Sequence, residues 1–348
     1  MSGIDLWVDP RAKVSYAGFY LAGFIEVLGA ERVRFARRPF CDLSQHSQEE
    51  DFDQYFAARL EPVGGPALKL VIDYRDRSRL SRTALDWADV YGKVNLHGDE
   101  LAGLETAQIR KVVPLGPGFG IRLWPWVATL AHFFRNTWRS RKQTPASFRA
   151  QVAAYHWQLR RQPLTTYSAV QSAPDYAFHV SKLYQKQAHG EKTNLMRAEF
   201  IRACRARAPR FEGGLVCSSS PVPQGYEDVA ISSGVSPAQY LENVRRSAVV
   251  FSTPAAWGCL GWKLGEFLAL GKAIVSTPIE HALPAPLEHG EHLLLAANPE
   301  QLKDSINRLF SDAVLRRRLE RNASAYFDQW LHPAAIARRL MAMGLQGA

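Results

Sequence analysis

The sequence has little cysteine and no long apolar segment. Its 348 residues include only four cysteines, which are Cys41, Cys204, Cys217 and Cys259. Their spacing fits neither a disulfide framework nor a metal site. The longest apolar stretch, residues 124–134, is interrupted and much shorter than the roughly 20 residues that a membrane-spanning helix needs. The first residues also lack the basic and apolar regions of a secretory signal. These absences predict a protein of the reducing cytoplasm.

Acidic residues are missing from one long segment. Residues 106–174 contain ten basic residues and no Asp or Glu, and the net charge of the whole chain is +10. Four of these basic residues are Arg135, Arg139, Arg141 and Lys142. Aromatic residues are interleaved with them at Trp124, Trp126, Phe133, Phe134, Trp138, Phe148, Tyr155 and Trp157. This mixture fits an anionic membrane, at whose surface the protein would be peripheral, or an anionic glycan. It also fits two surface helices whose aromatic residues pack on the first domain. Nucleic acid is not expected as a partner, because no nucleic-acid-binding motif accompanies the charge.

Strand and helix patterns alternate along two parts of the chain. In the first part, strands are expected at residues 4–8, 33–35, 68–73, 89–96 and 111–114, and helices at 16–28 and 47–60. A linker is expected within residues 162–174. After it, strands are expected at 176–180, 215–217, 248–252 and 273–275, and helices at 195–207, 300–310, 313–327 and 333–343. Such alternation predicts α/β domains with parallel sheets and ligands at the carboxyl ends of the strands.

Residues 262–277 form the most informative segment. Leu264, Phe267 and Leu268 lie on one face of a short helix, Gly271 is placed to end it, and an apolar strand follows. Lys263 falls in the first turn, where the helix dipole disfavours a cation. An ordinary amphipathic helix is one interpretation. A diphosphate lying against the helix end would explain the lysine directly.

This segment resembles the donor-binding helix of GT-B glycosyltransferases, the large group that includes sucrose, glycogen and lipopolysaccharide enzymes. In that group a glutamate is followed by small and apolar residues, Gly-Lys and a strand, and Glu266 takes its place here. The resemblance implies that Glu266 binds the nucleotide ribose. Gly258 stands where the group has a second glutamate, eight positions upstream, near the sugar. The resemblance also implies two doubly wound Rossmann-like domains facing a cleft, at residues 1–165 and 173–325, and a C-terminal helix at 326–348 that crosses back to the first domain.

Three further pieces of the second domain fit a nucleotide-diphosphate site. Ser181 and Lys182 directly follow a strand. Asn194 is a good N-cap, so Arg197 is expected in the first turn of the next helix, again against the dipole. The loop at 253–261 carries two glycines that allow close approach to phosphate. The predicted donor site consists of Ser181, Lys182, Asn194, Arg197, Trp257, Gly258, Gly261, Lys263 and Glu266.

The acceptor side has several candidate bases. An inverting enzyme needs a carboxylate or histidine near the acceptor hydroxyl, and the candidates are Asp9, Asp73, His97 and Asp99. His97 and Asp99 are preferred as catalytic residues because they follow a strand. A retaining enzyme needs no such base, since the donor phosphate can accept the proton, and retention is slightly favoured by the resemblance.

Glycines and one acidic pair complete the inventory of the first domain. Gly18 is expected near the first loop of the cleft, and the glycine-rich loop at 116–120 either lines the cleft or makes a tight connection. Asp51 and Asp53 fall inside a predicted acidic helix, so no protein-bound metal is expected.

The sequence therefore predicts a cytoplasmic GT-B glycosyltransferase. It would move a hexosyl or related sugar from a nucleotide-diphosphate sugar to a polysaccharide, glycolipid or lipid-linked acceptor. The nucleotide sugar is a substrate, and no cofactor is expected. Two alternatives remain open, a GT-B-fold nucleotide-sugar epimerase and a two-lobed solute-binding protein, although the missing signal argues against the latter.

Overall fold

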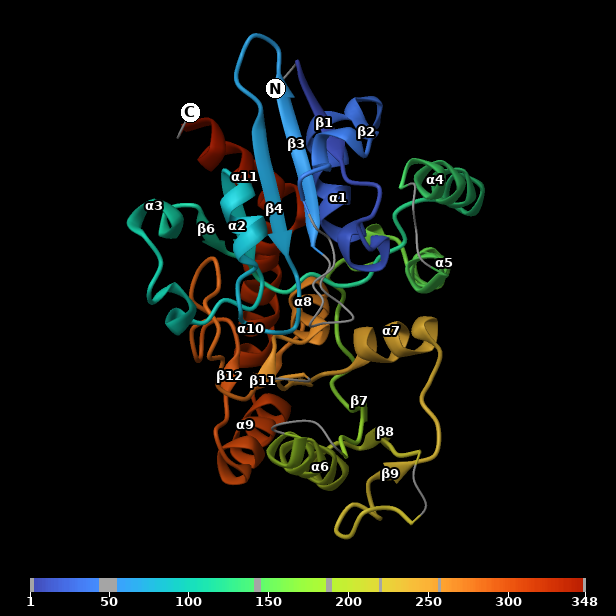
Figure 1. Cartoon of the computed structure of the whole chain (residues 1–348). Helices are drawn as coiled ribbons and strands as arrows, with labels where there is room; N and C mark the ends of the chain where they lie inside the picture. Colours follow the sequence, from blue (N-terminus) through green and yellow to red (C-terminus); the bar gives the residue numbers. More distant parts are fainter. Residues whose placement is uncertain are drawn as a thin grey trace. The chain divides into compact units, whose positions relative to one another are not determined.

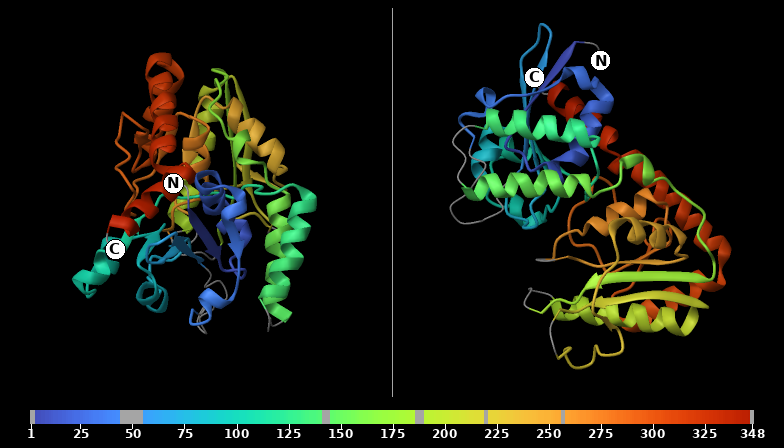
Figure 2. Two further views of the ribbon diagram at one scale, coloured as in Figure 1. Left: turned by 90° about the horizontal axis from the view of Figure 1, so that it is seen from above. Right: turned by 90° about the vertical axis from the view of Figure 1, so that its right-hand side faces the viewer.

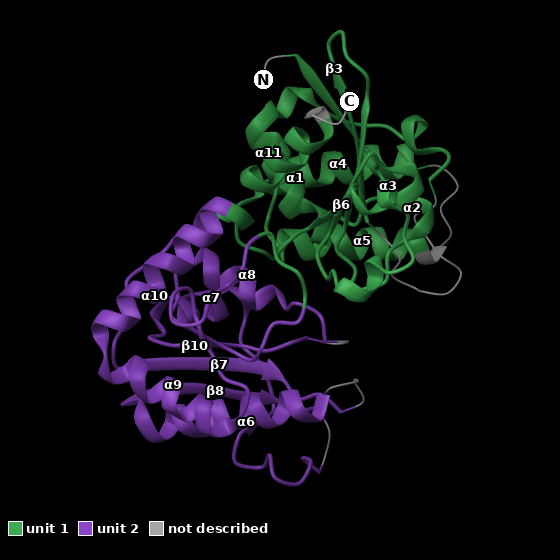
Figure 3. Ribbon diagram, turned by 90° about the vertical axis from the view of Figure 1, so that its left-hand side faces the viewer, with its two compact units in different colours: residues 1–164, 281–284, 330–348 green, residues 165–280, 285–329 purple. Residues whose placement is uncertain are grey.

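The computed structural model describes residues 3–43, 55–140, 145–185, 190–218, 221–255 and 258–346. The chain forms two compact units, shown in Figure 3. Unit 1 comprises Met1–Leu164, His281–Pro284 and Trp330–Ala348, and unit 2 comprises Thr165–Glu280 and Ala285–Gln329. The short segment His281–Pro284 was expected in the second domain. It belongs to unit 1 because the N–H of Ala282 donates to the carbonyl of Leu96 at 2.8 Å.

Unit 1 is built on one sheet with the strand order β2-β1-β3-β4-β5-β6 (Figure 1). Its strands are β1 (Ile4–Val8), β2 (Val33–Phe35), β3 (Phe56–Pro62), β4 (Leu68–Asp73), β5 (Val90–Lys93) and β6 (Val112–Pro114). Neighbouring strands are parallel except that β3 is antiparallel to both β1 and β4. The sheet is therefore mixed, whereas the sequence pattern predicted a parallel one.

The predicted helix at residues 47–60 is wrong over its last part, because residues 56–60 belong to β3. Phe56, Ala57 and Ala58 are all buried in the middle of the sheet, and a strand buried on both faces lacks the alternation of polar and apolar residues. The Gly64-Gly65 pair after β3 makes the hairpin turn to β4, with Gly64 at φ 78°. Asp51 and Asp53 lie outside the described residues.

Two long helices pack against each other in unit 1. They are α1 (Val14–Leu28) and the C-terminal α11 (Pro333–Gln346). Gly23 permits their close approach, since a Cβ atom at this position would lie 2.0 Å from the carbonyl oxygen of Pro333. The shorter α2 (Arg82–Trp87) and α3 (Thr106–Ile109) and the longer α4 (Trp126–Arg139) and α5 (Pro145–Leu159) complete the unit. The return of the C-terminal helix to the N-terminal part of the chain is thus confirmed.

Unit 2 contains two three-stranded parallel sheets. One has the order β7 (Tyr176–Lys182), β8 (Arg210–Val216), β9 (Ala230–Ile231), and the other β10 (Val250–Ser252), β11 (Ile274–Ser276), β12 (Leu294–Leu295). A hydrogen bond of 2.8 Å from the N–H of Ala248 to the carbonyl of Tyr176 connects the start of β10 to β7. The strand order therefore runs in opposite directions on the two sides of β7. Such a reversal is where open α/β sheets bind ligands.

The helices of unit 2 are α6 (Gly190–Arg207), α7 (Pro237–Arg246), α8 (Trp262–Ala269), α9 (Pro299–Ser311) and α10 (Ala313–Tyr326). Their apolar residues form a continuous core with the strands, in which Phe200, Phe251 and Leu319 are buried. A π-helical turn at Phe327–Leu331 joins α10 to α11, where the chain leaves unit 2. Two Rossmann-like α/β units confirm the predicted fold class.

Candidate functional site

The site begins with Lys263 in the first turn of α8. This helix has Gly261 as its N-cap and no acidic residue in its first turn. The Lys263 ammonium donates to the carbonyl of Val180 in β7 and lies 5.7 Å from the centre of the Tyr240 ring. Burial and the nearby Arg197 together lower the pKa of Lys263 to about 7, although Glu266 acts in the opposite direction. An anion beside this group would raise its pKa and hold the positive charge in place.

Glu266 lies one turn after Lys263 on α8 and is only 6% exposed. Residues three apart on a helix face the same side, so the carboxylate and the ammonium belong to one local group. Glu266 is thus a buried acidic side chain beside Lys263, and its carboxylate oxygens could accept hydrogen bonds from ligand hydroxyl groups.

Asn194 and Arg197 lie in α6, but the helix begins earlier than predicted. It starts at Gly190, and Glu191 in its first turn is favoured by the helix dipole. Asn194 is therefore not an N-cap, and Arg197 is not in the first turn. Instead, the Asn194 amide holds the loop after β7: its Nδ2 donates to the carbonyl of Tyr184 at 2.6 Å, and its Oδ1 accepts from the N–H of Tyr184 at 2.9 Å.

The guanidinium of Arg197 joins three segments of unit 2. It donates to the Thr253 hydroxyl at 2.9 Å, to the Lys182 carbonyl at 3.1 Å and to the Pro254 carbonyl at 3.3 Å. It also lies 4.6 Å from the centre of the Tyr184 ring and is 5% exposed. Arg197 therefore shapes the loops that follow β7 and β10. The side chain of Lys182, at the end of β7, is exposed.

His179 and Ser181 lie on the same face of β7, two residues apart. The Nε2 atom of His179 and the hydroxyl of Ser181 are 2.8 Å apart, and both side chains are buried. Burial holds the pKa of His179 well below its usual range, and Lys263 and Arg197 lower it further. The ring is therefore neutral, and the positive charge at the end of β7 comes from the lysines and the arginine.

Sequence reasoning missed three residues of this group, His179, Tyr184 and Thr253. His179 is a polar residue inside an otherwise apolar strand, and Thr253 is the first residue after β10, at the predicted ligand-binding edge. Both residues could therefore have been recognised in the sequence as candidate site residues. Tyr184 carried none, because its role depends on contacts with Asn194 and Arg197.

The loop before α8 is described only in part. Trp257 lies outside the described residues. Gly258 has φ of +73°, a conformation that favours glycine. At Gly261, a Cβ atom would lie 3.5 Å from the carbonyl oxygen of Thr253 and 3.8 Å from the Cβ of Ala255, both ordinary contacts. Gly258 is thus required by the course of the backbone, independently of any ligand.

In unit 1, the predicted catalytic pair follows β5. The Nδ1 atom of His97 and a carboxylate oxygen of Asp99 are 3.2 Å apart, with the side chains 42% and 92% exposed. The His97 ring also lies 6.3 Å from that of His281, edge to face. A carboxylate on one ring nitrogen orients a histidine and leaves the other nitrogen to take up a proton.

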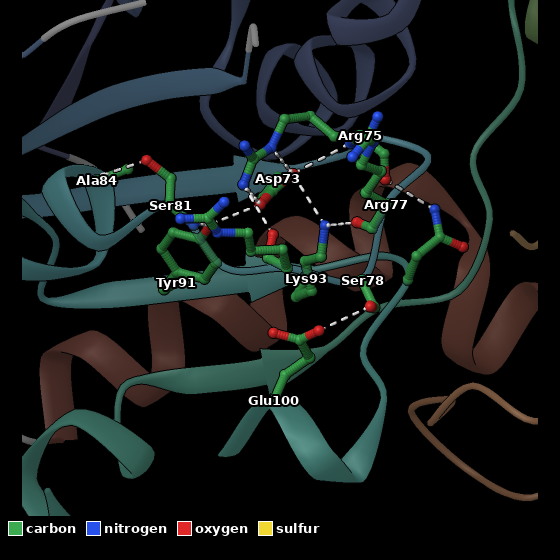
Figure 4. Close-up of polar contacts among 11 residues, drawn as sticks. Asp73, Arg75, Arg77, Ser78, Ser81, Ala84, Tyr91, Lys93 and Glu100 are labelled. Atoms are coloured by element: carbon green, nitrogen blue, oxygen red, sulfur yellow. Dashed lines mark hydrogen bonds and ion pairs between the residues drawn. The ribbon is translucent and has the colours of Figure 1, made fainter. Parts of the chain in front are cut away.

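Asp73, another candidate base, is the centre of a buried ion-pair network (Figure 4). Its carboxylate contacts the guanidinium of Arg75 at 2.7 Å and the ammonium of Lys93 at 3.2 Å, and it accepts a hydrogen bond from the Tyr91 hydroxyl. Lys93 and Arg75 hold the pKa of Asp73 far below its usual range, against the effect of burial. A general base needs a pKa near the working pH, so Asp73 is unsuitable.

Asp9 is held in a similar way at the end of β1. Its two carboxylate oxygens accept from Arg11, with the shortest distance 2.6 Å, and its side chain is fully buried. The same guanidinium donates to the carbonyl of Leu43 at 2.8 Å. Asp9 therefore fixes the loop after β1, and His97 with Asp99 is the remaining candidate pair.

The glycines of unit 1 serve packing. Gly18 lies inside α1 and not in a loop, because the helix already begins at Val14, and its nearest neighbour is Leu123. In the loop after β6, a Cβ atom at Gly116 would lie 2.2 Å from Leu331, and one at Gly118 would lie 2.8 Å from Phe19. The loop is a tight connection between packed elements.

Two features are absent from the described part of the chain. Within it, no three His, Cys, Asp or Glu side chains come together as ligands for a metal ion. Within the same residues, no helix has the length and apolar character needed to cross a membrane.

One family model matches part of the chain, and several solved structures resemble it at low sequence identity. Residues 196–342 match the model of the family described as glycosyl transferase-like. No curated protein matches the chain. A glycosyltransferase from Rickettsia africae is 12% identical, with 80% of this chain and 70% of that chain covered and a TM-score of 0.43. Anabaena HepE, crystallised with UDP-glucose, is 16% identical, with 80% and 72% covered and a TM-score of 0.42.

The family match covers the part of the chain that holds Arg197, Lys263 and Glu266. It favours glycosyl transfer over the epimerase and solute-binding alternatives, and it confirms the resemblance read from residues 262–277. Residues 196–342 match the glycosyl transferase-like family, and this match supports glycosyl transfer as the activity of this part of the chain.

Proposed function

We propose that the enzyme binds the diphosphate of a nucleotide sugar at the carboxyl ends of β7 and β10. The observation that carries this proposal is the gathering of Lys182, Arg197 and Lys263 at the point where the strand order reverses. Lys263 is half-buried in the first turn of α8, which contains no acidic residue. A diphosphate would supply the negative charge that both the helix end and the three cations favour.

The residues of α8 and β7 then have separate roles. Glu266 binds the ribose hydroxyls, and Lys263 binds phosphate. Lys182 reaches the diphosphate from the end of β7, while Arg197 supplies charge and holds the loops at Thr253 and Pro254. Ser181, Asn194, Trp257, Gly258 and Gly261 complete the proposed donor site. The nucleotide sugar is the substrate, and no cofactor is proposed.

We propose retention of configuration as the slightly favoured course, with the leaving phosphate accepting the proton of the acceptor hydroxyl. Inversion is the alternative. In it, His97 accepts that proton while Asp99, 3.2 Å from its Nδ1 atom, orients the ring. Product stereochemistry, read by NMR of the first-formed glycoside, separates these two courses.

The proposed acceptor is a glycan, a glycolipid or a lipid-linked sugar in polysaccharide or glycolipid assembly. We place the enzyme in the cytoplasm, at the inner face of a membrane. The support is chemical: residues 106–174 hold ten basic residues and no acidic one, together with several aromatic residues. Acidic lipid and a lipid diphosphate both carry the complementary charge.

Calorimetry with UDP, GDP, CMP and dTDP tests the proposed donor site. One nucleotide should bind wild-type protein, and Glu266→Ala and Lys263→Ala should each weaken its binding. Charge-assisted hydrogen bonds contribute roughly 1.5 to 3 kcal/mol, which corresponds to a loss of about one to two decades of affinity. Unchanged affinity in both folded variants would refute the assignment of the site.

A further inference from the structure

The helices α4 and α5 of unit 1 run side by side (Figure 2) and are joined through residues 141–144, which lie outside the described residues. A buried glutamine connects them to the rest of the unit. Gln158 accepts from the N–H groups of Leu123 and Trp124 at 2.6 and 3.2 Å, and its amide donates to the Thr129 hydroxyl at 3.0 Å. Gln158 is 0% and Thr129 1% exposed, so this contact is internal.

A second polar contact lies further along the pair. The Asn136 amide of α4 donates to the Tyr155 hydroxyl of α5 at 2.8 Å, and both side chains are buried. The Ser140 hydroxyl donates to the Asn136 carbonyl at 2.6 Å. Polar side chains of both helices therefore point inward, where a helix of a globular protein normally places apolar ones.

The aromatic residues of this region divide into two sets. Trp124, Phe133 and Tyr155 pack inward with Val14, so packing on the first domain accounts for them. The second set is exposed.

On α4, the second set comprises Trp126, Val127, Phe134 and Trp138, which are 62%, 74%, 65% and 75% exposed. At 3.6 residues per turn, these four lie within about 120° of the helix circumference. Phe148, Val152 and Trp157 of α5 are 43%, 41% and 47% exposed. The three on α5 are spread over about 180° of its circumference, with Trp157 opposite Phe148. The four residues of α4 therefore form what we call the outer aromatic face.

Exposed arginines border the outer aromatic face. They are Arg135 and Arg139 on α4, Arg149 on α5 and Arg160 just after it. No acidic residue of the chain lies between positions 106 and 174 that could balance them locally. Tryptophan and phenylalanine beside arginine, without acids, complement the interface of an anionic bilayer, where aromatic rings lie at headgroup level and cations meet acidic lipid. An apolar surface for another protein would not need this excess of one charge.

We propose that α4 and α5 form a membrane-docking element that inserts its outer aromatic face into the headgroup region of an anionic bilayer. The inward polar contacts hold the two helices on unit 1, and the outward rings enter the lipid. Arg135 and Arg139 lie beside the inserted rings and contact acidic headgroups. The inference deepens the proposed membrane location and does not depend on which sugar is transferred.

Sedimentation of the full-length protein with vesicles tests the proposal. Vesicles of phosphatidylcholine alone are compared with vesicles that contain phosphatidylglycerol, at low and high salt. The aromatic variant is Trp126→Ser/Phe134→Ser/Trp138→Ser, and the charge variant is Arg135→Gln/Arg139→Gln. Arg79→Gln/Arg82→Gln is the matched control, because it removes two exposed arginines of unit 1 that lie outside the acid-free segment 106–174. Circular dichroism shows whether each variant is folded.

We expect wild-type binding that rises with phosphatidylglycerol and falls with salt. The charge variant should lose about fivefold in partition per arginine, and the aromatic variant about tenfold or more in total. The matched control should bind at least fivefold more tightly than the charge variant. In wild-type protein, vesicles should also shield tryptophan fluorescence from acrylamide, and the aromatic variant should lose this shielding.

Three results would overturn the proposal. The first is that the wild-type protein does not bind vesicles. The second is that the charge variant and its control lose the same amount of vesicle binding. The third is that the aromatic variant leaves vesicle binding unchanged but abolishes a concentration-dependent dimer or a nucleic-acid complex. If the aromatic variant does not fold, the charge variant and its control still decide. Nucleotide calorimetry separates this proposal from the donor site, because docking variants should bind nucleotide as wild type does.

Discussion

Lys263 is the residue on which most of the electrostatic argument rests. Its ammonium lies in the first turn of α8, near Arg197, and burial lowers its pKa to about 7. About half of the lysine is therefore charged near pH 7. The charged fraction grows as the pH falls below this value and is lost as the pH rises above it. A bound diphosphate reverses this shift, because a nearby negative charge favours the protonated amine.

This reversal predicts proton uptake on binding. At pH 8 the ligand-free lysine is largely neutral, so binding of a nucleoside diphosphate should take up a fraction of a proton approaching one. Calorimetry in buffers of different ionisation enthalpy measures this number directly. Lys263→Arg is the matched variant, since arginine stays protonated at this pH. Equal proton uptake in wild type and Lys263→Arg would show that Lys263 is not the titrating group.

Lys182 and Arg197 differ in how they meet the ligand, and a pair of variants separates them. Lys182 is exposed, so Lys182→Ala should weaken binding of a nucleoside diphosphate by about tenfold and leave nucleoside binding unchanged. Arg197 is buried and holds Thr253 and Pro254, so Arg197→Lys should weaken the diphosphate and also lower the thermal stability of unit 2. Equal losses of nucleoside and diphosphate affinity in Lys182→Ala would contradict its phosphate contact.

The residues of the site were predictable where a local rule was broken. The position of Lys263 in the first turn of a helix, and that of Lys182 at the end of a strand, can both be predicted from the neighbouring residues alone. The prediction that Asn194 caps α6 was wrong because an asparagine side chain can also bond to backbone groups outside a helix end. Here it bonds to the backbone N–H and carbonyl of Tyr184. The contacts of Thr253 with Arg197 span 56 positions, and no local pattern encodes such a pair.

Among the elements, most helices and strands follow from hydrophobic periodicity, and β3 is the exception. A central strand with buried residues on both faces has the same apolar run as a buried helix segment, and only the Gly64-Gly65 turn distinguishes them. The pairing of α4 with α5 shows a related limit. Periodicity marks an apolar face on α4, but it does not say whether that face points inward.

The packing of α1 on α11 gives a prediction at this scale. A Cβ atom at Gly23 would lie 2.0 Å from the backbone of Pro333, which no side-chain rotation can relieve. Gly23→Ala should therefore force the helices apart and destabilise unit 1 by about 1 to 3 kcal/mol. Gly65→Ala is the control, because its added Cβ makes only ordinary contact with Pro62. Chemical denaturation compares the two, and equal unfolding midpoints would mean that α11 is not seated as described.

At the scale of the whole molecule, the chain crosses between its units at residues 164–165, 280–281, 284–285 and 329–330. The first crossing leads into a segment that unit 2 holds firmly. The ammonium of Lys272, which follows Gly271 at the end of α8, donates to the Ser172 hydroxyl and, at 2.8 Å, to the Arg245 carbonyl. Ser172 in turn donates to Glu320 at 2.7 Å. The Gly-Lys pair of the donor-binding segment therefore has a structural role, because it ties the linker to the second unit.

Lys272 makes the stability of unit 2 depend on pH in a defined direction. Burial lowers its pKa from 10.5 to about 7, and its side chain is 0% exposed. Between these two values the unfolded chain binds a proton at this lysine and the folded chain does not. The free energy of unfolding must therefore rise with pH in this window, by up to roughly 1 kcal/mol per pH unit from this group.

Denaturation of unit 2 at pH 7, 8 and 9 measures this slope. Lys272→Met should reduce the slope by the contribution of this lysine, whatever its effect on the absolute stability, because methionine cannot titrate. Lys263, whose pKa is also lowered to about 7, keeps its own contribution. Lys192→Met is the control: Lys192 is exposed on α6 in the same unit, and its removal should leave the slope unchanged. An unchanged slope in Lys272→Met would show that the buried lysine keeps its proton when the protein folds. The contacts to Ser172 and Arg245 would then stabilise a charged group in the interior, and they would not change between pH 7 and 9.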